Sequence, residues 1–148
     1  MPMQNTARSA DKVMVNGDIV FTIMGGPIQV YSLHSELITL GDNTASTLQW
    51  QSTPTVGTAT TISGATSALG STPVPAAGAT VILTPTALST APTIALASAG
   101  GVQLGLAAQN HIIVNAGTLN LVIGVGSTTS VWRHYLVYIP LAAGVMVF

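Results

Sequence analysis

Two apolar stretches near the C-terminal end of the chain show the clearest alternation of hydrophobic and polar positions. In residues 119–125 and 131–139, apolar or aromatic side chains recur at every second position, and many of them are β-branched. Residues 126–130 between them are small or polar. This spacing is typical of β-strands, and the short gap predicts that the two strands form a β-hairpin. Pro140 cannot donate a hydrogen bond to a ladder, so we expect the second strand to end there, followed by a short strand over 144–148.

The first third of the chain predicts a strand over residues 17–24, with Ile19, Phe21 and Ile23 on one face. The Gly25-Gly26-Pro27 sequence that follows is a strong turn signal, because glycine permits positive φ and proline restricts its own φ. Further strands are expected over 28–40 and 47–51, and we interpret the whole series as successive antiparallel hairpins.

The predicted strand over residues 28–40 contains a slip in its alternation. Ile28 and Val30 are in one phase, whereas Leu33 and Leu37 are in the other. A β-bulge near Ser32 would bring both sets to the core, because a bulge inserts one extra residue into a strand. In residues 47–51, Leu48 and Trp50 share a face without any slip.

Residues 52–110 are rich in Ser, Thr, Ala, Gly and Pro, a composition that a linker would also have. Short strand-like pieces nevertheless recur between the glycines and prolines, at residues 58–62, 80–84, 93–97 and 102–106. Residues 111–115, with His111 on a predicted strand, then lead into the C-terminal hairpin. No stretch shows a helical stripe with charged flanks. The sequence therefore predicts an all-β fold, an antiparallel β-sandwich or a jelly-roll-like barrel.

The chain of 148 residues is long enough for one domain with a buried core. We expect a single β domain over 13–148, preceded by an extended N-terminal arm over 1–12. The arm has no apolar periodicity and contains two of the three basic residues, Arg8 and Lys12. It would lie on a neighbouring subunit or fold back on its own domain, and the first arrangement makes Arg8 and Lys12 contact residues.

Charged residues make up 5% of the chain, against about a quarter in ordinary soluble proteins. No residue between Asp42 and Arg133 is charged. Soluble monomers normally carry a mixture of charges on their surface. So neutral a surface favours packing against other subunits, and we expect a homo-oligomer, specifically a homotrimer.

Several other functions are disfavoured by the sequence. No apolar run reaches the about 20 residues that a membrane-spanning helix needs, and the N-terminus does not have the pattern of a signal peptide. There is no cysteine, which fits assembly in a reducing cytoplasm. Three basic residues with a net charge of −1 cannot neutralise a run of phosphates, so we expect no nucleic-acid partner.

The residues that carry chemistry do not form a recognisable catalytic or metal motif. The spacing of the four acidic residues in the sequence does not indicate a pair of carboxylates for acid–base catalysis. The histidines His34, His111 and His134 are far apart in sequence, without the short-range spacing of a metal site. No Gly-x-Ser-x-Gly nucleophile elbow is present. We therefore expect no catalytic residues, no metal and no cofactor.

Four residues of the second C-terminal strand are candidates for interaction. Trp132, Tyr135 and Tyr138 could form a stacking platform for a sugar or could pack in the core. Arg133 is the single charge of the segment, and a buried arginine is costly unless it is paired. We expect Arg133 either to reach solvent or to meet an acidic residue, and Glu36 and Asp42 are the candidates by type.

The two ends of the chain resemble virion proteins of tailed bacteriophages. At the C-terminal end the resemblance rests on an apolar strand, a Gly/Ser/Thr turn, the Tyr-Ile-Pro-Leu sequence at 138–141 and the Ala143-Gly144 pair. At the N-terminal end it rests on residues 17–39, Leu48 and the Pro-Thr-Val-Gly sequence at 54–57. Residues 60–105 have no counterpart.

This resemblance implies a structural part of a virion rather than an enzyme. Together with the low charge, it leads us to expect a capsid decoration (cement) protein. Such a protein binds the major capsid protein or other virion subunits on the capsid surface, after assembly in the host cytoplasm. The alternative is a receptor- or glycan-binding module of the virion that uses Trp132, Tyr135 and Tyr138.

Overall fold

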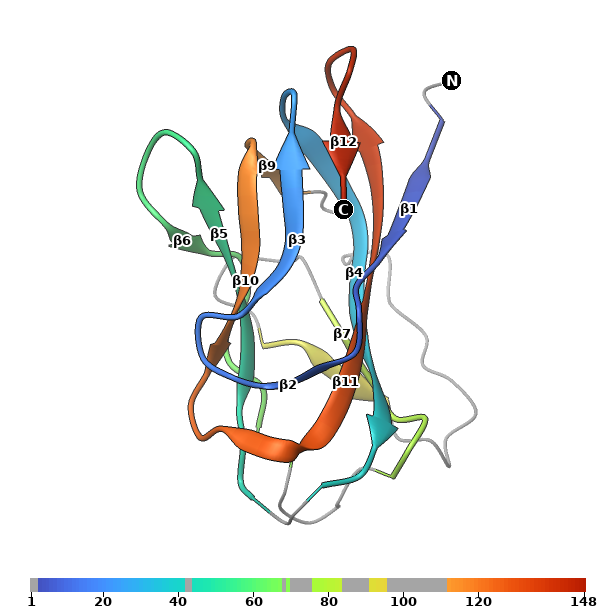
Figure 1. Cartoon of the computed structure of the whole chain (residues 1–148), viewed down its shortest axis with the longest axis vertical. Coiled ribbons are helices and arrows are strands. Elements are labelled where there is room, and N and C mark those ends of the chain that lie inside the picture. Colours follow the sequence, from blue (N-terminus) through green and yellow to red (C-terminus); the bar gives the residue numbers. More distant parts are fainter. Residues whose placement is uncertain (1–2, 42–43, 68, 70–75, 84–90, 96–111) are drawn as a thin grey trace.

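A computed structural model describes residues 3–41, 44–67, 69, 76–83, 91–95 and 112–148. These residues form β-strands, turns and loops, and no helix. The strands form two antiparallel sheets that pack face to face as a β-sandwich (Figure 1). The predicted all-β fold is therefore confirmed, with a sandwich in place of the closed barrel.

The larger sheet has seven strands, and β1, β11, β4, β7 and β8 follow one another across it. The other two strands lie beside this path, where β2 pairs with β11 and β9 pairs with β4. The bounds of its strands are β1 Asn5–Arg8, β2 Lys12–Met14, β4 Ile28–Thr39, β7 Thr80–Ile82, β8 Thr93–Ala95, β9 Ile112–Val114 and β11 Ser127–Pro140.

The smaller sheet has five strands in the order β12, β3, β10, β5, β6. Their bounds are β3 Ile19–Met24, β5 Leu48–Pro54, β6 Thr60–Thr61, β10 Gly117–Ile123 and β12 Met146–Val147. None of these five strands contains a charged residue. Among the described residues, the charged side chains therefore lie outside the strands of this sheet, with Asp18 directly before β3.

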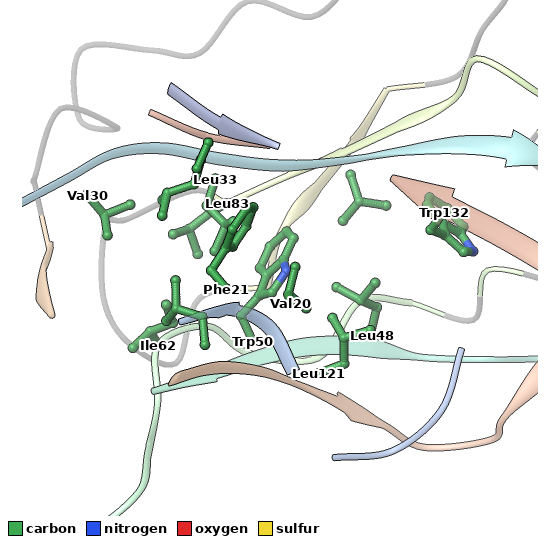
Figure 2. Packing of buried hydrophobic residues seen from close by; sticks show 14 of the residues in the cluster. Val20, Phe21, Val30, Leu33, Leu48, Trp50, Ile62, Leu83, Leu121 and Trp132 are labelled. Atoms are coloured by element: carbon green, nitrogen blue, oxygen red, sulfur yellow. The ribbon is translucent and has the colours of Figure 1, made fainter. Parts of the chain in front are cut away.

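The core lies between the sheets and consists of side chains at alternate positions of the long strands. From the smaller sheet come Phe21, Leu48, Trp50 and Leu121, and the larger sheet contributes Leu33, Trp132 and others (Figure 2). Each large aliphatic or aromatic side chain buried in this way contributes about 1.5–3 kcal/mol of hydrophobic free energy. This packing holds the two sheets together.

Both strands of the predicted C-terminal hairpin exist, but they do not pair with each other, so the predicted hairpin is wrong. Strand β10 belongs to the five-stranded sheet and β11 to the seven-stranded sheet. Residues 124–126 therefore carry the chain from one sheet to the other. The same holds for β3, β4 and β5, which alternate between the sheets. Alternation shows that one face of a strand is buried, but it does not distinguish pairing within a sheet from packing across the sandwich.

The predicted β-bulge in β4 is confirmed. Val137 of β11 pairs with Ser32, whereas the next residue, Tyr138, pairs with Val30, so Tyr31 is the inserted residue. Because of this insertion, Val30 and Leu33 are both buried.

A second bulge, which the sequence did not predict, lies in β3. Leu119 pairs with Phe21 and Asn120 with Ile19, which leaves Val20 as the inserted residue. Val20 and Phe21 are consequently both buried, and Ile19, expected on the core face, is exposed. The inserted residue shifts the phase of the strand and turns Ile19 outward.

The extended N-terminal arm is not confirmed. Residues Asn5–Arg8 form β1, which pairs with Tyr135–Tyr138 of β11 at the edge of the larger sheet (Figure 1). Ala7 and Ser9 are buried there. The N-terminal segment therefore folds back on its own domain, because the edge of β11 offers it backbone partners.

Most of the other predicted strands appear in shorter form. Strands β6, β7, β8 and β9 fall within the expected segments, and β11 ends at Pro140 as expected. Strand β12 lies within the predicted last strand. The strand expected over 102–106 lies outside the described residues.

Candidate interaction surface

The charged residues that the structure describes gather around the N-terminal edge of the seven-stranded sheet. They are Arg8, Asp11, Lys12, Asp18, Glu36 and Arg133. Five of them lie on or next to β1, β2, β4 and β11, and Asp18 lies directly before β3. We call them the charged cluster. Acidic and basic members are equal in number, so the cluster has no net charge. A surface of this kind can be hydrated without strongly attracting an ion of either sign.

Arg133 pairs with Asp11, which lies between β1 and β2. The Arg133 Nε atom donates to Asp11 Oδ1 at 2.7 Å, and Nη2 donates to Oδ2 at 3.0 Å. This bidentate geometry lowers the pKa of Asp11 and raises the pKa of Arg133. Glu36 was the wrong choice of acid, and Asp42 lies outside the described residues. Of the two expected outcomes for Arg133, contact with solvent or with an acidic residue, the structure shows the acidic partner, Asp11.

Arg8 is the last residue of β1 and Lys12 is the first residue of β2. Arg8 lies opposite Tyr135 on the outer face of the sheet. Lys12 Nζ lies 3.3 Å from Asp18 Oδ1, just before β3. Both basic residues therefore belong to the surface of their own domain and not to a separate arm.

Tyr135 connects the cluster to strand β4. Its ring stacks on His34, with ring centroids 4.9 Å apart and an interplanar angle of 14°. Its hydroxyl donates to Glu36 Oε2 at 2.9 Å. Partial burial lowers the pKa of His34, while the nearby Glu36 opposes this shift. The outer face of β4 and β11 therefore has an ordered polar arrangement.

His134 lies on the opposite, inward face of β11 and is fully buried. Its Nδ1 atom and Ser35 Oγ are 2.6 Å apart. No described residue gives its Nε2 atom a hydrogen bond. Burial lowers the pKa of His134 to about 3, and the positive charges of Lys12 and His34 act in the same direction. The imidazole is therefore neutral in the folded protein near neutral pH.

Ser9 binds the backbone of His134 from the edge of the sheet. The Ser9 amide donates to the His134 carbonyl oxygen at 2.9 Å. The His134 amide in turn donates to Ser9 Oγ at 3.0 Å. Sequence inspection did not single out Ser9, because a serine in a polar N-terminal segment has no distinguishing pattern.

The three aromatic residues proposed as a stacking platform do not share a face. Trp132 and Tyr138 are 2% and 6% exposed and belong to the buried core, and Figure 2 shows Trp132 there. Trp132 Nε1 donates to Ser130 Oγ at 2.9 Å. Tyr135 points outward to His34 and Glu36. The platform is therefore wrong, because odd and even positions of a strand lie on opposite faces.

A pocket of about 230 Å³ opens at the far edge of the sandwich. It lies between β5 and β6 of one sheet and β9 of the other. Its lining contains no charged residue and consists of Ser52, Pro54, Thr58, Thr60, Ile62, Ile112, Ile113, Val114 and Asn115. These side chains suit an uncharged, largely apolar group.

The described residues contain no group of three or more His, Cys, Asp or Glu side chains that could hold a metal ion. His34 and His134 project to opposite faces of the larger sheet, and His111 lies outside the described residues. In the same part of the chain, no helix is long and apolar enough to cross a membrane.

Comparisons with protein-family models, with curated proteins and with solved structures gave no match. The function therefore has to be argued from the residues and their arrangement.

Proposed function

We propose that this protein is a non-enzymatic structural subunit of a tailed-bacteriophage virion, a decoration protein that binds and stabilises the capsid shell. The observation that carries the proposal is the separation of charge on the sandwich. Five of the six residues of the charged cluster lie on or beside strands of the seven-stranded sheet, and the sixth, Asp18, directly precedes β3. The strands of the five-stranded sheet themselves contain no charge. The resemblance of both chain ends to phage virion proteins supplies the biological setting.

An uncharged sheet face is suited to lie against another protein. Its outward side chains include exposed apolar residues, Ile19, Met24 and Met146. They also include threonine, glutamine and asparagine residues, such as Thr22, Gln51, Thr118 and Asn120. These groups can form hydrogen bonds with a partner without the desolvation cost of buried charges. We propose that this face lies on the major capsid protein, and that the charged cluster faces solvent.

The ion pairs and the pocket lining favour a protein-binding role over nucleic-acid binding or catalysis. Arg133 and Lys12 are paired with Asp11 and Asp18, so a nucleic acid would have to displace these carboxylates. The edge pocket is lined by no acidic residue and no histidine, which disfavours acid–base chemistry there. A receptor- or glycan-binding role is not proposed, because Trp132 and Tyr138 are buried.

The test is to add the purified protein to shells that lack it and to measure co-sedimentation and the thermal stability of the shells. We expect binding at regular sites and a higher disruption temperature. Gln51→Lys places a charge on the outer face of the five-stranded sheet and should weaken shell binding at least tenfold. Arg8→Glu, in the charged cluster, is the matched control and should bind like the wild type.

Location of the protein in a reconstruction of the virion gives an independent check. Density for the sandwich on the outer shell, with the five-stranded sheet inward, is the expected result. Density confined to the tail, or no binding to shells, would show that this is not a decoration protein.

A further inference from the structure

The edge pocket has a buried floor and an exposed mouth. Ser52, Ile62 and Val114 form the floor, and they are 8%, 3% and 2% exposed. Thr58 and Asn115 are exposed at the mouth. The floor joins the two sheets, because Ser52 belongs to β5 and Val114 belongs to β9, which pairs with β4. The pocket is therefore an opening between the two layers of the sandwich.

The small side chain of Ser52 leaves this space between the sheets. Alternate positions of β5 face inward, and the two inward positions before Ser52 hold the large side chains of Leu48 and Trp50. Ser52 instead directs a hydroxyl into the pocket. Within the described part of the chain, this hydroxyl has no hydrogen-bond partner. Because a buried hydroxyl is costly to leave unpaired, it favours a ligand that can form a hydrogen bond there.

Backbone hydrogen bonds fix the walls of the pocket. The Thr55 amide donates to the Ala116 carbonyl oxygen at 2.8 Å, which ties the turn between β5 and β6 to the connection between β9 and β10. At the mouth, Thr60 Oγ1 donates to the Thr58 carbonyl oxygen at 3.3 Å. The three strands around the pocket lie at one edge of the sandwich (Figure 1). A preformed pocket loses little affinity to the ordering of its own groups.

We propose that the edge pocket binds a small uncharged molecule with one apolar ring and one hydroxyl group, in particular a monocyclic phenol. Its ring lies against Ile62, Ile112 and Val114, and its hydroxyl pairs with the Ser52 hydroxyl, which can both donate and accept. The volume of about 230 Å³ exceeds the roughly 150 Å³ in which an apolar cavity holds benzene. One ring with small substituents therefore fits.

The lining distinguishes this ligand from charged molecules and from sugars. The described residues that form the pocket include no charged side chain, so an ionised ligand would lose its hydration without gaining a partner. A sugar has several hydroxyls, whereas Ser52 is the single polar side chain on the buried floor. The walls of isoleucine, valine and proline instead suit an apolar ring.

This ligand site goes beyond the proposed function and does not depend on it. The pocket opens between the sheets, whereas the face proposed to lie on the shell is the outer face of the five-stranded sheet. One molecule can therefore bind a phenol and a shell at the same time. Shell binding by a protein that takes up no phenol would refute this inference alone.

Titration of the wild-type protein with 4-methylphenol, which is uncharged at neutral pH, is the first measurement. Calorimetry should show saturable one-to-one binding with a Kd of about 1 mM or below. Nuclear Overhauser contacts should join the ring protons of the ligand to the methyl groups of Ile62 and Val114. The charged analogue 4-methylbenzoate should not bind. Absence of saturable binding, contacts to other methyl groups, or equal binding of the benzoate would overturn the inference.

Ser52→Ala tests the hydrogen bond inside the pocket. The variant should bind 4-methylphenol about fivefold more weakly than the wild type, but it should bind toluene, which has no hydroxyl, at least as tightly. Ser46→Ala is the matched control, because Ser46 is buried and its hydroxyl has no partner among the described residues, yet it lies outside the pocket. Unchanged affinity of Ser52→Ala for 4-methylphenol would contradict the assignment, as would an equal loss in Ser46→Ala.

Thr60→Trp tests the position of the site without altering the buried floor. Thr60 is exposed at the mouth, so a large side chain there should obstruct entry and weaken the binding of both 4-methylphenol and toluene at least tenfold. Because a ligand that binds the folded state raises its stability, 4-methylphenol should raise the melting temperature of the wild type and leave that of Thr60→Trp almost unchanged. An equal rise in both proteins would place the ligand elsewhere and overturn the inference.

Discussion

His134 and Ser35 share a hydrogen bond of 2.6 Å on the buried face of the larger sheet, directly behind His34 and Tyr135 on its outer face. The two residues are paired across β11 and β4. Their sequence neighbours, Tyr135 and His34, form the stacked pair on the outer face. The same pair of strands therefore holds a neutral imidazole inside the sandwich and a polar arrangement outside.

The stability of the fold should decrease when the pH falls below about 6.5. Burial lowers the pKa of His134 to about 3, so between these two values the unfolded chain binds a proton that the folded protein does not. The free energy of unfolding then falls by up to about 1.4 kcal/mol per pH unit. Above pH 6.5 the histidine should cause no pH dependence. Denaturant titrations between pH 7.5 and 4.5 measure this slope.

His134→Gln should flatten that slope, because glutamine does not titrate. His34→Gln is the matched control on the outer face, and it should leave most of the slope, since His34 is only half-buried. The lowered pKa of Asp11 acts below its ordinary value near 4, outside the range measured. An unchanged slope in His134→Gln would contradict the assignment.

Ser9→Ala should destabilise the protein by roughly 1–3 kcal/mol, the usual cost of leaving a buried hydrogen-bonding group unsatisfied. The substitution removes the hydroxyl that accepts from the His134 amide. Thr6→Ala, at an exposed position of β1, is the control and should change stability little. Thermal unfolding of both variants gives the comparison, and equal melting temperatures would show that Ser9 does not hold β1 in place.

Breaking the pair between Asp11 and Arg133 should loosen the N-terminal segment more than the fold as a whole. Asp11→Asn and Arg133→Gln should each accelerate hydrogen exchange at the β1 amides, and the double variant should add little further. Because the pair is exposed to salt, high ionic strength should have a similar effect in the wild type. Additive effects of the two substitutions would indicate that the residues act independently.

Gly117→Ala should be strongly destabilising. Gly117 has a φ of +151°, and an added Cβ would lie 2.2 Å from the carbonyl oxygen of Thr53 on the neighbouring strand. We expect a loss of at least about 1–3 kcal/mol, the range for a strained backbone alone. Gly17→Ala is the control, because Gly17 also has positive φ but has open space around it. A similar loss in both variants would mean that the contact with Thr53 is easily relieved.

Deletion of residues 1–12 distinguishes between a free N-terminal arm and a strand that stabilises the domain. A free arm would be dispensable for folding, whereas β1 contributes four pairs in register with β11 and the buried Ala7. We therefore expect the truncated protein to fold with a lower melting temperature. A truncated protein as stable as the full chain would favour the arm.

The sequence by itself determined that the chain is β, where most of its strands lie, and that β4 contains a bulge. These are local properties: alternation, glycine and proline positions, and a slip in phase are visible within a few residues. The sequence could also predict that Arg133 would either reach solvent or meet an acidic residue, because an unpaired charge is costly wherever it is buried.

Only the tertiary structure decided which strands pair and which acid meets Arg133. Strands β10 and β11 are adjacent in sequence but lie in different sheets, and Asp11 comes from a segment that has no apolar pattern. Alternation placed Trp132 and Tyr138 on one face of β11 and Tyr135 on the other, but it could not say which face is buried. Packing against the opposite sheet decided that, because burial depends on residues that are distant in the chain.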